Sequence, residues 1–256
     1  MSTLTYILLF TFIGSVGALI GGMALLANKR FALRISHFLA SFAAGTLLGT
    51  AFFDLLPEAS EAAEKTHTDV FLWTLIGLIF FFFIERSIHW FHHHEEDDDL
   101  KHAEEKKSAL PLIIIGDTVH NFIDGIVIAA TFMVNVPLGV VTTLAVFAHE
   151  VPQEIGDFGL MLHKGMRRKN IILVNVISAA VSFAGAIMTY VVGNIFQNYI
   201  AIFLSLTAGF FIYIASSDIL PEIHKENRKR HAILESFLLV LGIFVIWYGI
   251  SLLEPR

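Results

Sequence analysis

The chain alternates long apolar stretches with short polar segments, and eight of the stretches are long enough to cross a bilayer as helices. A helix needs about 20 apolar residues to span the hydrocarbon core. The pattern therefore predicts an all-α membrane protein with eight transmembrane helices, numbered here as spans 1 to 8. They run over Leu4–Ala27, Phe31–Leu56, Val70–Phe91, Leu110–Val134, Leu138–His163, Ile171–Phe196, Tyr199–Leu220 and Ala232–Leu253.

Composition supports this prediction and narrows the chemistry. Of the 256 residues, 55% are hydrophobic and only 16% are charged, which disfavours a cytosolic, secreted or nucleic-acid-binding domain. The stretch Leu4–Ala27 carries no charge and no basic segment precedes it, so we expect a first span and not a signal peptide. The chain has no cysteine, so any metal site must use His, Asp, Glu, Asn or Gln.

The basic residues predict the orientation. All of the 17 Lys and Arg residues except Lys65 and Arg256 lie at the ends of odd-numbered spans, in the segments that follow them or, for Arg34, at the start of span 2. Because Lys and Arg accumulate on the cytoplasmic side, we expect both termini on the outer side of the plasma (inner) membrane.

Two spans share a motif. Span 2 ends in Asp54-Leu55-Leu56-Pro57-Glu58, and span 7 ends in Asp218-Ile219-Leu220-Pro221-Glu222, at an offset of 164 residues. Extended back to Ala40 without gaps, the comparison finds 8 identities in 19 positions. The two spans run in opposite directions in the expected topology, so we predict an inverted repeat. Spans 1–3 and 6–8 are its halves, and spans 4–5 form a central pair in a single domain, residues 1–256, of 3+2+3 helices.

The central pair carries polar residues at mid-membrane depth. Ionisable groups there are costly and mark ion paths, so nine polar side chains on two neighbouring helices exceed what helix association requires. Because the connection Asn135–Pro137 is short, we expect the spans to be antiparallel neighbours whose stripes face a divalent cation. The stripes are Asp117, His120, Asn121 and Asp124 on span 4, and His149, Glu150, Gln153, Glu154 and Asp157 on span 5.

These stripes resemble the two motifs of the ZIP (Zrt/Irt-like) metal transporter family. His120–Gly125 is similar to H-N-x-x-[DE]-G, and His149–Phe158 is similar to H-E-x-P-H-E-x-G-D-F. The resemblance implies transport of zinc, or of iron, manganese or another divalent metal, toward the cytosol through a site that can hold two ions. It implies no resident cofactor and no enzyme activity.

Carried over residue by residue, the resemblance divides the ligands between two positions. The first would use His120, His149 and Gln153, and the second Asn121, Asp124 and Glu150, with Glu154 nearby. Gln153 stands where the family motif has a second histidine, and Gln is a weaker ligand. Where some members place a carboxylate on span 6, this chain offers only Asn175, Ser178 and Ser182.

Three further features have two explanations each. The loop 92–108 contains His92, His93, His94 and His102, which either bind metal or are merely solvated. Asp54 and Glu58 at the outer end of span 2 either gather cations or solvate a helix end, and the acidic segment Pro57–Asp69 is expected to be an outer loop. The same alternatives apply at the inner end of span 7 to Asp218, Glu222 and His224.

Two other functions compete with transport. His149–Gln153 is similar to the H-E-x-x-H helix of zinc proteases, which suggests an intramembrane zinc metalloprotease, but Gln153 replaces the second His and Pro152 interrupts the helix. A metal-sensing membrane receptor is the third class. For transport, the expected partners are divalent metal ions, the lipid bilayer and a second copy in a homodimer, with no nucleic acid.

Overall fold

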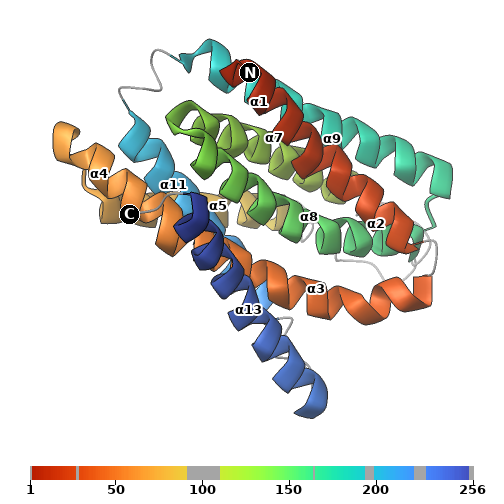
Figure 1. Cartoon of the computed structure of the whole chain (residues 1–256). Coiled ribbons are helices and arrows are strands. Elements are labelled where there is room, and N and C mark those ends of the chain that lie inside the picture. The colour runs from red at the N-terminus through yellow and green to blue at the C-terminus, as the bar shows by residue number, and fades with distance from the viewer. Residues whose placement is uncertain are drawn as a thin grey trace.

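The computed structural model describes residues 2–26, 29–90, 110–163, 165–193, 199–221 and 229–253, and within them it contains helices and turns but no strand (Figure 1). The prediction of an all-α protein is confirmed for this part of the chain. The helices are α1 (Thr3–Thr11), η1 (Phe12–Gly17), α2 (Ala18–Leu26), α3 (Lys29–Thr50), η2 (Ala51–Leu55), α4 (Leu56–Thr66), α5 (Val70–Trp90), α7 (Leu110–Val134), α8 (Val136–His163), α9 (Arg168–Val191), α11 (Ile200–Tyr213), η4 (Ile214–Ile219) and α13 (Lys229–Leu253), where η denotes a π-helix.

Each expected span corresponds to one continuous helix or to a run of consecutive helical segments. Among the described residues, six helical stretches are long and apolar enough to cross a membrane, and α5 adds a shorter apolar stretch, Val70–Ile84. The helix α8 is long enough, but its second half carries His149, Glu150, Glu154 and Asp157. The protein is therefore an integral membrane protein, while the total of eight spans stays a prediction.

The segment expected to be an acidic loop, Pro57–Asp69, is mostly helical, so that expectation is wrong. The helix continues from η2 into α4 and ends only at His67, which adopts a left-handed conformation with φ of 53°. Pro57 directly follows the π-helical segment η2, so it lies inside a continuous helix, where it has no N–H to donate to the preceding turn. The helix therefore continues through the proline and does not end at it.

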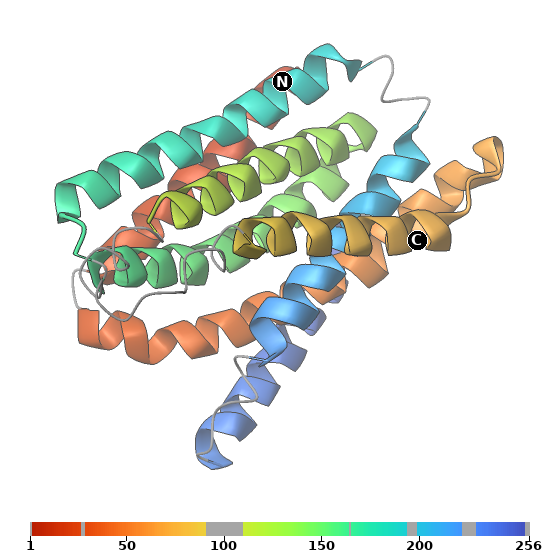
Figure 2. The same ribbon diagram turned by 180° about the vertical axis from the view of Figure 1, so that it is seen from behind.

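The helices pack in two groups. One contains α1, η1 and α2 with α7, α8 and α9, and the other contains α3, η2 and α4 with α5, α11 and α13. Figure 1 shows the first group as a layer of roughly aligned helices, and Figure 2 shows α11 and α13 crossing beside it. The groups meet mainly where α3 packs on α8 and α11 packs on α7.

Two helix pairs in the second group use glycine in the same way. On α3 and α13, a Cβ added at Gly45 would overlap the carbonyl oxygen of Leu239, and one at Gly242 would overlap that of Phe42. On α11 and α5, a Cβ added at Gly209 would overlap the carbonyl oxygen of Thr74, and one at Gly77 would overlap that of Leu206. Only glycine permits so close an approach of two helix backbones.

These two contacts occupy matching places in the expected repeat. Gly45 and Gly209 are separated by the offset of 164 that aligns spans 2 and 7, as are Phe42 and Leu206. The π-helical segments repeat as well, because η2 at Ala51–Leu55 aligns with residues 215–219 of η4. The sequence similarity of spans 2 and 7 is thus accompanied by a similarity of local geometry and packing.

Candidate metal centre

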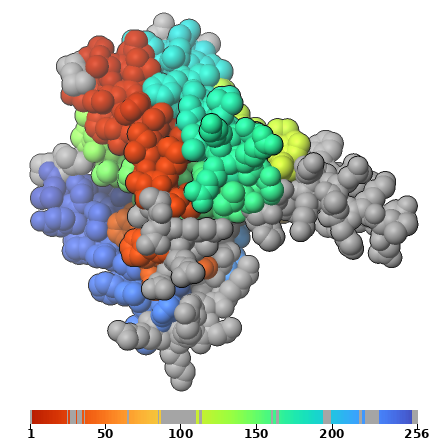
Figure 3. Space-filling view, turned by 90° about the vertical axis from the view of Figure 1, so that its right-hand side faces the viewer, coloured from red at the N-terminus to blue at the C-terminus, as the bar shows by residue number. Residues whose placement is uncertain are grey.

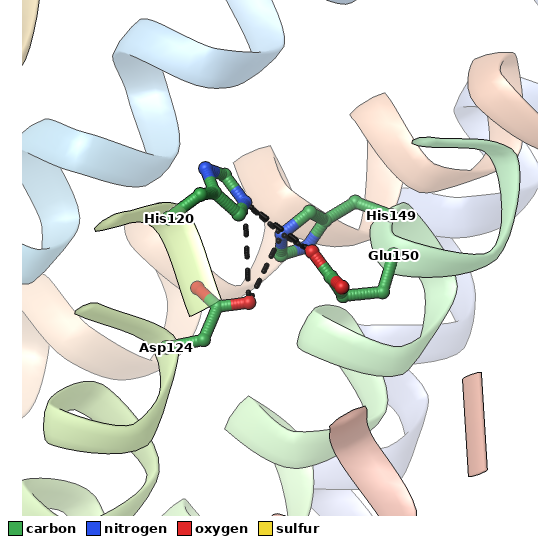
Figure 4. Close-up of side chains that lie close together, drawn as sticks. All are labelled: His120, Asp124, His149 and Glu150. Atoms are coloured by element: carbon green, nitrogen blue, oxygen red, sulfur yellow. Dashed lines mark hydrogen bonds and ion pairs between the residues drawn. The ribbon is translucent and has the colours of Figure 1, made fainter. Parts of the chain in front are cut away.

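Four side chains from two helices converge on one point between α7 and α8. His120 and Asp124 come from α7, and His149 and Glu150 come from α8 (Figure 4). One ligand atom of each residue lies within 4.8 Å of the other three. Asp124, His149 and Glu150 are buried, and His120 is half-buried.

The spacing of these atoms matches a tetrahedral zinc site. Zinc bonds of about 2.0–2.1 Å at tetrahedral angles separate neighbouring ligand atoms by about 3.3–3.4 Å. Here the Nε2 atoms of His120 and His149 are 3.1 Å apart. The Oε1 atom of Glu150 lies 3.4 Å from Nε2 of His120 and 3.8 Å from Nε2 of His149. The Oδ2 atom of Asp124 lies 3.5 Å from Nε2 of His149 and 3.9 Å from Nε2 of His120.

One oxygen of each carboxylate at this centre accepts no hydrogen bond. These oxygens, Oδ2 of Asp124 and Oε1 of Glu150, are buried and have only the two histidine rings nearby. A buried polar group without a partner is costly, and a buried charge is more so, unless a counter-ion or metal is present. Two carboxylates and two neutral imidazoles carry a formal charge of −2, which a divalent cation neutralises.

The backbone orients His149 toward the same point. Its Nδ1 lies 3.0 Å from the carbonyl oxygen of Ala145, which can only accept a hydrogen bond, so Nδ1 carries the proton. In the neutral ring the lone pair is then on Nε2, the atom that faces the other three ligands. The chain thus presents His149 in the tautomer that a metal requires.

The local sequence explains how the ligands meet. His120 and Asp124 are four residues apart, so they lie one turn apart on the same face of α7. Asn135 alone separates α7 from α8, and its Oδ1 accepts a 2.7 Å hydrogen bond from the Leu138 N–H at the start of α8. This tight turn makes the two helices antiparallel neighbours, as the sequence predicted.

Apolar rings enclose the centre on the side of the second helix group. The ring of Phe81 on α5 lies edge-on to His120 with centroids 6.1 Å apart. The ring of Phe211 on α11 lies edge-on to the ring of His149, with centroids 6.3 Å apart. Both phenylalanines are buried, so the metal centre lies where the two groups of helices meet.

The remaining polar residues of α7 and α8 lie beside the four-residue centre. Asn121 and Asp117 bond to each other, with 3.0 Å from Nδ2 to Oδ1, and Glu154 accepts a 2.9 Å hydrogen bond from Asn175 on α9. Gln153 and Asp157 are half-buried on α8. The structure therefore gathers members of both expected ligand positions around one point.

The more distant candidates lie elsewhere. Asp54 is buried in η2 and Glu58 is half-buried in α4, on the second helix group. The backbone of Asp218 belongs to η4, but its side chain lies outside the described residues. The remaining expected residues also lie outside the described part of the chain. They are Glu222, His224 and the loop 92–108 with His92, His93, His94 and His102.

Sequence reasoning did not identify Ser15. This residue of η1 is buried, and its single hydroxyl hydrogen is shared between Oδ1 of Asn121 and the carbonyl oxygen of Ala179, each 3.0 Å from Oγ. The available signal was a single serine between Gly14 and Gly17 in a span without charge. Nothing in that pattern indicates a partner 106 residues away.

Comparison with known proteins agrees with this geometry. The sequence profile described as "ZIP Zinc transporter" matches residues 2–111 and 92–248. The chain belongs to the ZIP family. It is 38% identical over 149 residues to zinc transporter ZIP10 of Danio rerio, a match that covers 56% of this chain and 17% of that protein.

Two further ZIP relatives show the same relation. Zinc transporter ZIP4 of Mus musculus is 38% identical over 149 residues, which are 57% of this chain and 22% of that protein. Zinc transporter foi of Drosophila melanogaster is 39% identical over 142 residues, which are 56% of this chain and 19% of that protein. The chain thus spans about a fifth of the length of the curated ZIP relatives it matches.

Proposed function

We propose that this ZIP protein transports a divalent metal cation through the centre formed by His120, Asp124, His149 and Glu150. Zinc is the first candidate, and iron and manganese are the alternatives. The observation that carries the proposal is the spacing of the four ligand atoms. Their five separations that involve a histidine nitrogen run from 3.1 to 3.9 Å, and all four atoms lie within 4.8 Å of one another. Two imidazoles with two carboxylates form a ligand set suited to zinc, and carboxylates also accept iron and manganese.

The ligand set supports transport because it balances affinity against release. The cation loses water at the centre and gains four protein ligands that neutralise its charge. All four ligands come from α7 and α8, and the centre borders the second helix group through Phe81 and Phe211. A shift of one group against the other would change which side of the membrane reaches the ion.

The arrangement of the spans is part of the same proposal. The chain is proposed to form a 3+2+3 inverted repeat with both termini outside the plasma (inner) membrane, so that transport leads to the cytosol. The repeated glycine contacts of α3–α13 and α11–α5 support the repeat. Asp54 and Glu58 are proposed to attract cations outside, Asp117 and Asp157 to line the path, and Asp218, Glu222 and His224 to receive them inside. The homodimer stays a prediction.

The metalloprotease alternative is not supported by this geometry. In H-E-x-x-H proteases both histidines come from one helix. Here the two histidines of the centre come from α7 and α8, and Gln153 occupies the place of the second motif histidine. With four protein ligands on the ion, no position remains for the water that such a protease activates.

Uptake by proteoliposomes tests the proposed transport. Purified full-length protein should move radioactive zinc into sealed vesicles, and Asp124→Asn should remove most of that flux because it deletes a ligand charge at constant shape. Glu64→Gln, an exposed carboxylate on α4, is the matched control and should transport normally. Equal zinc flux in Asp124→Asn and wild type would overturn the assignment of the centre.

Single cysteines test the orientation, because the chain has no native cysteine. Asp54 is too buried to label well, so exposed neighbours of the helix ends serve better. Glu61→Cys on α4 should react with an impermeant maleimide in intact cells, and Asn170→Cys on α9 only after permeabilisation. Labelling of both positions from one side would contradict the proposed topology.

A further inference from the structure

A second polar group lies beside the metal centre, and it is saturated with hydrogen bonds. Nδ2 of Asn121 donates to Oδ1 of Asp117 at 3.0 Å, to the backbone oxygen of Asp117 at 3.2 Å and to Oγ of Ser178 at 3.4 Å. Oδ1 of Asn121 accepts from Ser15 at 3.0 Å. Asn121 is 1% exposed, so these contacts account for both polar atoms of its amide.

The chemistry of the partners determines which way the amide faces. The backbone oxygen of Asp117 can only accept a hydrogen bond, so the NH2 end of Asn121 must point toward it. The carbonyl end, which is the only atom of the amide that can ligate a cation, then faces the hydroxyl of Ser15. One of the two lone pairs of that oxygen is occupied by Ser15, so Asn121 can offer both to a metal only after breaking this bond.

Ser15 joins three helices at this place. Its hydroxyl reaches Asn121 on α7 and the carbonyl oxygen of Ala179 on α9 from the π-helical segment η1. Figure 3 shows the helix of residues 3–26 lying directly against α9 on the surface of the molecule. The close approach also depends on Gly14, where an added Cβ would lie 3.1 Å from Ile128 of α7.

The rotation of α7 about its own axis depends on this contact. Asp117 and Asn121 form one row four residues apart, and His120 and Asp124 form the adjacent row, about 60° away around the helix. Fixing Asn121 toward Ser15 and Ser178 therefore directs His120 and Asp124 toward α8. The same contact occupies one lone pair of the Asn121 oxygen and directs that oxygen toward Ser15.

We infer that Ser15 and Asn121 are positioning residues for the α7 ligands, and that the centre holds one tetrahedral divalent cation per chain and not two. This inference rests on the proposed function. The four ligands of the first ion are complete without Asn121, and the oxygen that would serve a second ion is bonded to Ser15.

Cobalt titration of the full-length protein in nanodiscs tests both parts, because tetrahedral Co²⁺ has a strong visible absorption band. All samples carry Asn in place of the four loop histidines, so that loop binding is not counted. Wild type in this background should bind one Co²⁺ per chain, by elemental analysis after desalting, and should show the tetrahedral band. Asn121→Ala should bind more weakly and still bind one ion.

The serine variants separate positioning from general stability. Ser15→Ala should weaken Co²⁺ binding by about 10-fold, the usual effect of losing a partner that orients a ligand, and should reduce the tetrahedral band. Ser15→Thr, which keeps the hydroxyl, should restore both. Ser205→Ala is the matched control, since Ser205 is also fully buried but donates only to Ala201 of its own helix.

The outcomes distinguish the inference from the proposed function. Two Co²⁺ per chain in wild type, with the second lost in Asn121→Ala, would overturn the inference and leave transport through the centre intact. An unchanged band and affinity in Ser15→Ala would overturn the positioning role. A wild-type protein that binds no Co²⁺ at the centre would overturn the metal site itself, and with it the proposed function.

Discussion

The interface between α7 and α8 is held by different contacts from the interface between α3 and α13. Between α7 and α8 lie two histidines and two carboxylates, with buried oxygens that have no donor. Between α3 and α13 lie glycines and backbone carbonyls in close contact. The first interface carries buried charge that a bound divalent cation would neutralise, whereas the glycine contacts of the second need no ion.

Glycine contacts of the same kind also join α7 to α9, where a Cβ added at Gly125 would overlap the carbonyl oxygen of Ser182. The difference therefore assigns different tasks to individual interfaces and not to whole helix groups. Close backbone packing leaves little freedom for helices to shift against each other, so α3–α13 and α11–α5 suit a fixed frame. The polar interface carries the ligands and meets that frame through aromatic rings. Substitutions in the first interface should therefore change transport, and substitutions in the second should change stability.

The largest effect is expected from His149→Ala. Removing one of four ligands and the ring that it orients should lower zinc uptake by at least about 10- to 100-fold, the range seen when metal-site partners are lost. Uptake per molecule of protein in proteoliposomes is the measurement. His37→Ala, an exposed histidine on α3, is the control. Normal uptake in His149→Ala would show that α7–α8 does not carry the ion.

The second prediction concerns the glycine interface. Gly45→Ala places a methyl group against the carbonyl oxygen of Leu239 and should destabilise the protein by about 1–3 kcal/mol, as overpacking does. Gly209→Ala, its match on α11, should cost a similar amount. Gly249→Ala on α13, where nothing lies within 4 Å of an added Cβ, is the control. Stability is measured by thermal unfolding in detergent. A loss of stability in Gly249→Ala as large as in the other two variants would contradict this account.

The third prediction uses pH to separate the two interfaces. Histidine and carboxylate bind metal only when deprotonated, so protons compete with zinc at the centre. Zinc uptake at subsaturating concentration should fall several-fold as external pH drops from 7.5 to 5.5, through the ordinary histidine range near ~6.5. The glycine contacts themselves are with backbone and apolar atoms that do not titrate, so the loss of thermal stability caused by Gly45→Ala should change far less over the same range. Flat uptake over this range would argue against histidine ligands.

The smallest effect is expected outside both interfaces. Deleting residues 95–105 of the histidine-rich loop should leave the zinc flux within about two-fold of wild type, because the segment lies outside the spans that carry the four ligands. The measurement is initial uptake rate against zinc concentration. A well-inserted deletion protein without flux would place the loop in the path of the ion.

Much of this arrangement could be predicted from the sequence because the patterns are local. Apolar stretches near 20 residues predict the helices, and four-residue spacing predicts which side chains share a face. The short turn at Asn135 then predicts that the stripes of α7 and α8 face each other. Pro57 shows the limit of such local evidence, since the helix continues through it into α4.

The sequence by itself determined that this is a helical membrane protein with a metal-binding stripe on spans 4 and 5. Only the tertiary structure decided which residues of the stripe meet, because that depends on the rotation of each helix against its neighbours. It brought His120, Asp124, His149 and Glu150 together and turned Asn121 toward Ser15. A hydrogen bond between residues 106 positions apart leaves no periodic trace in the chain, so no pattern along the sequence predicts it.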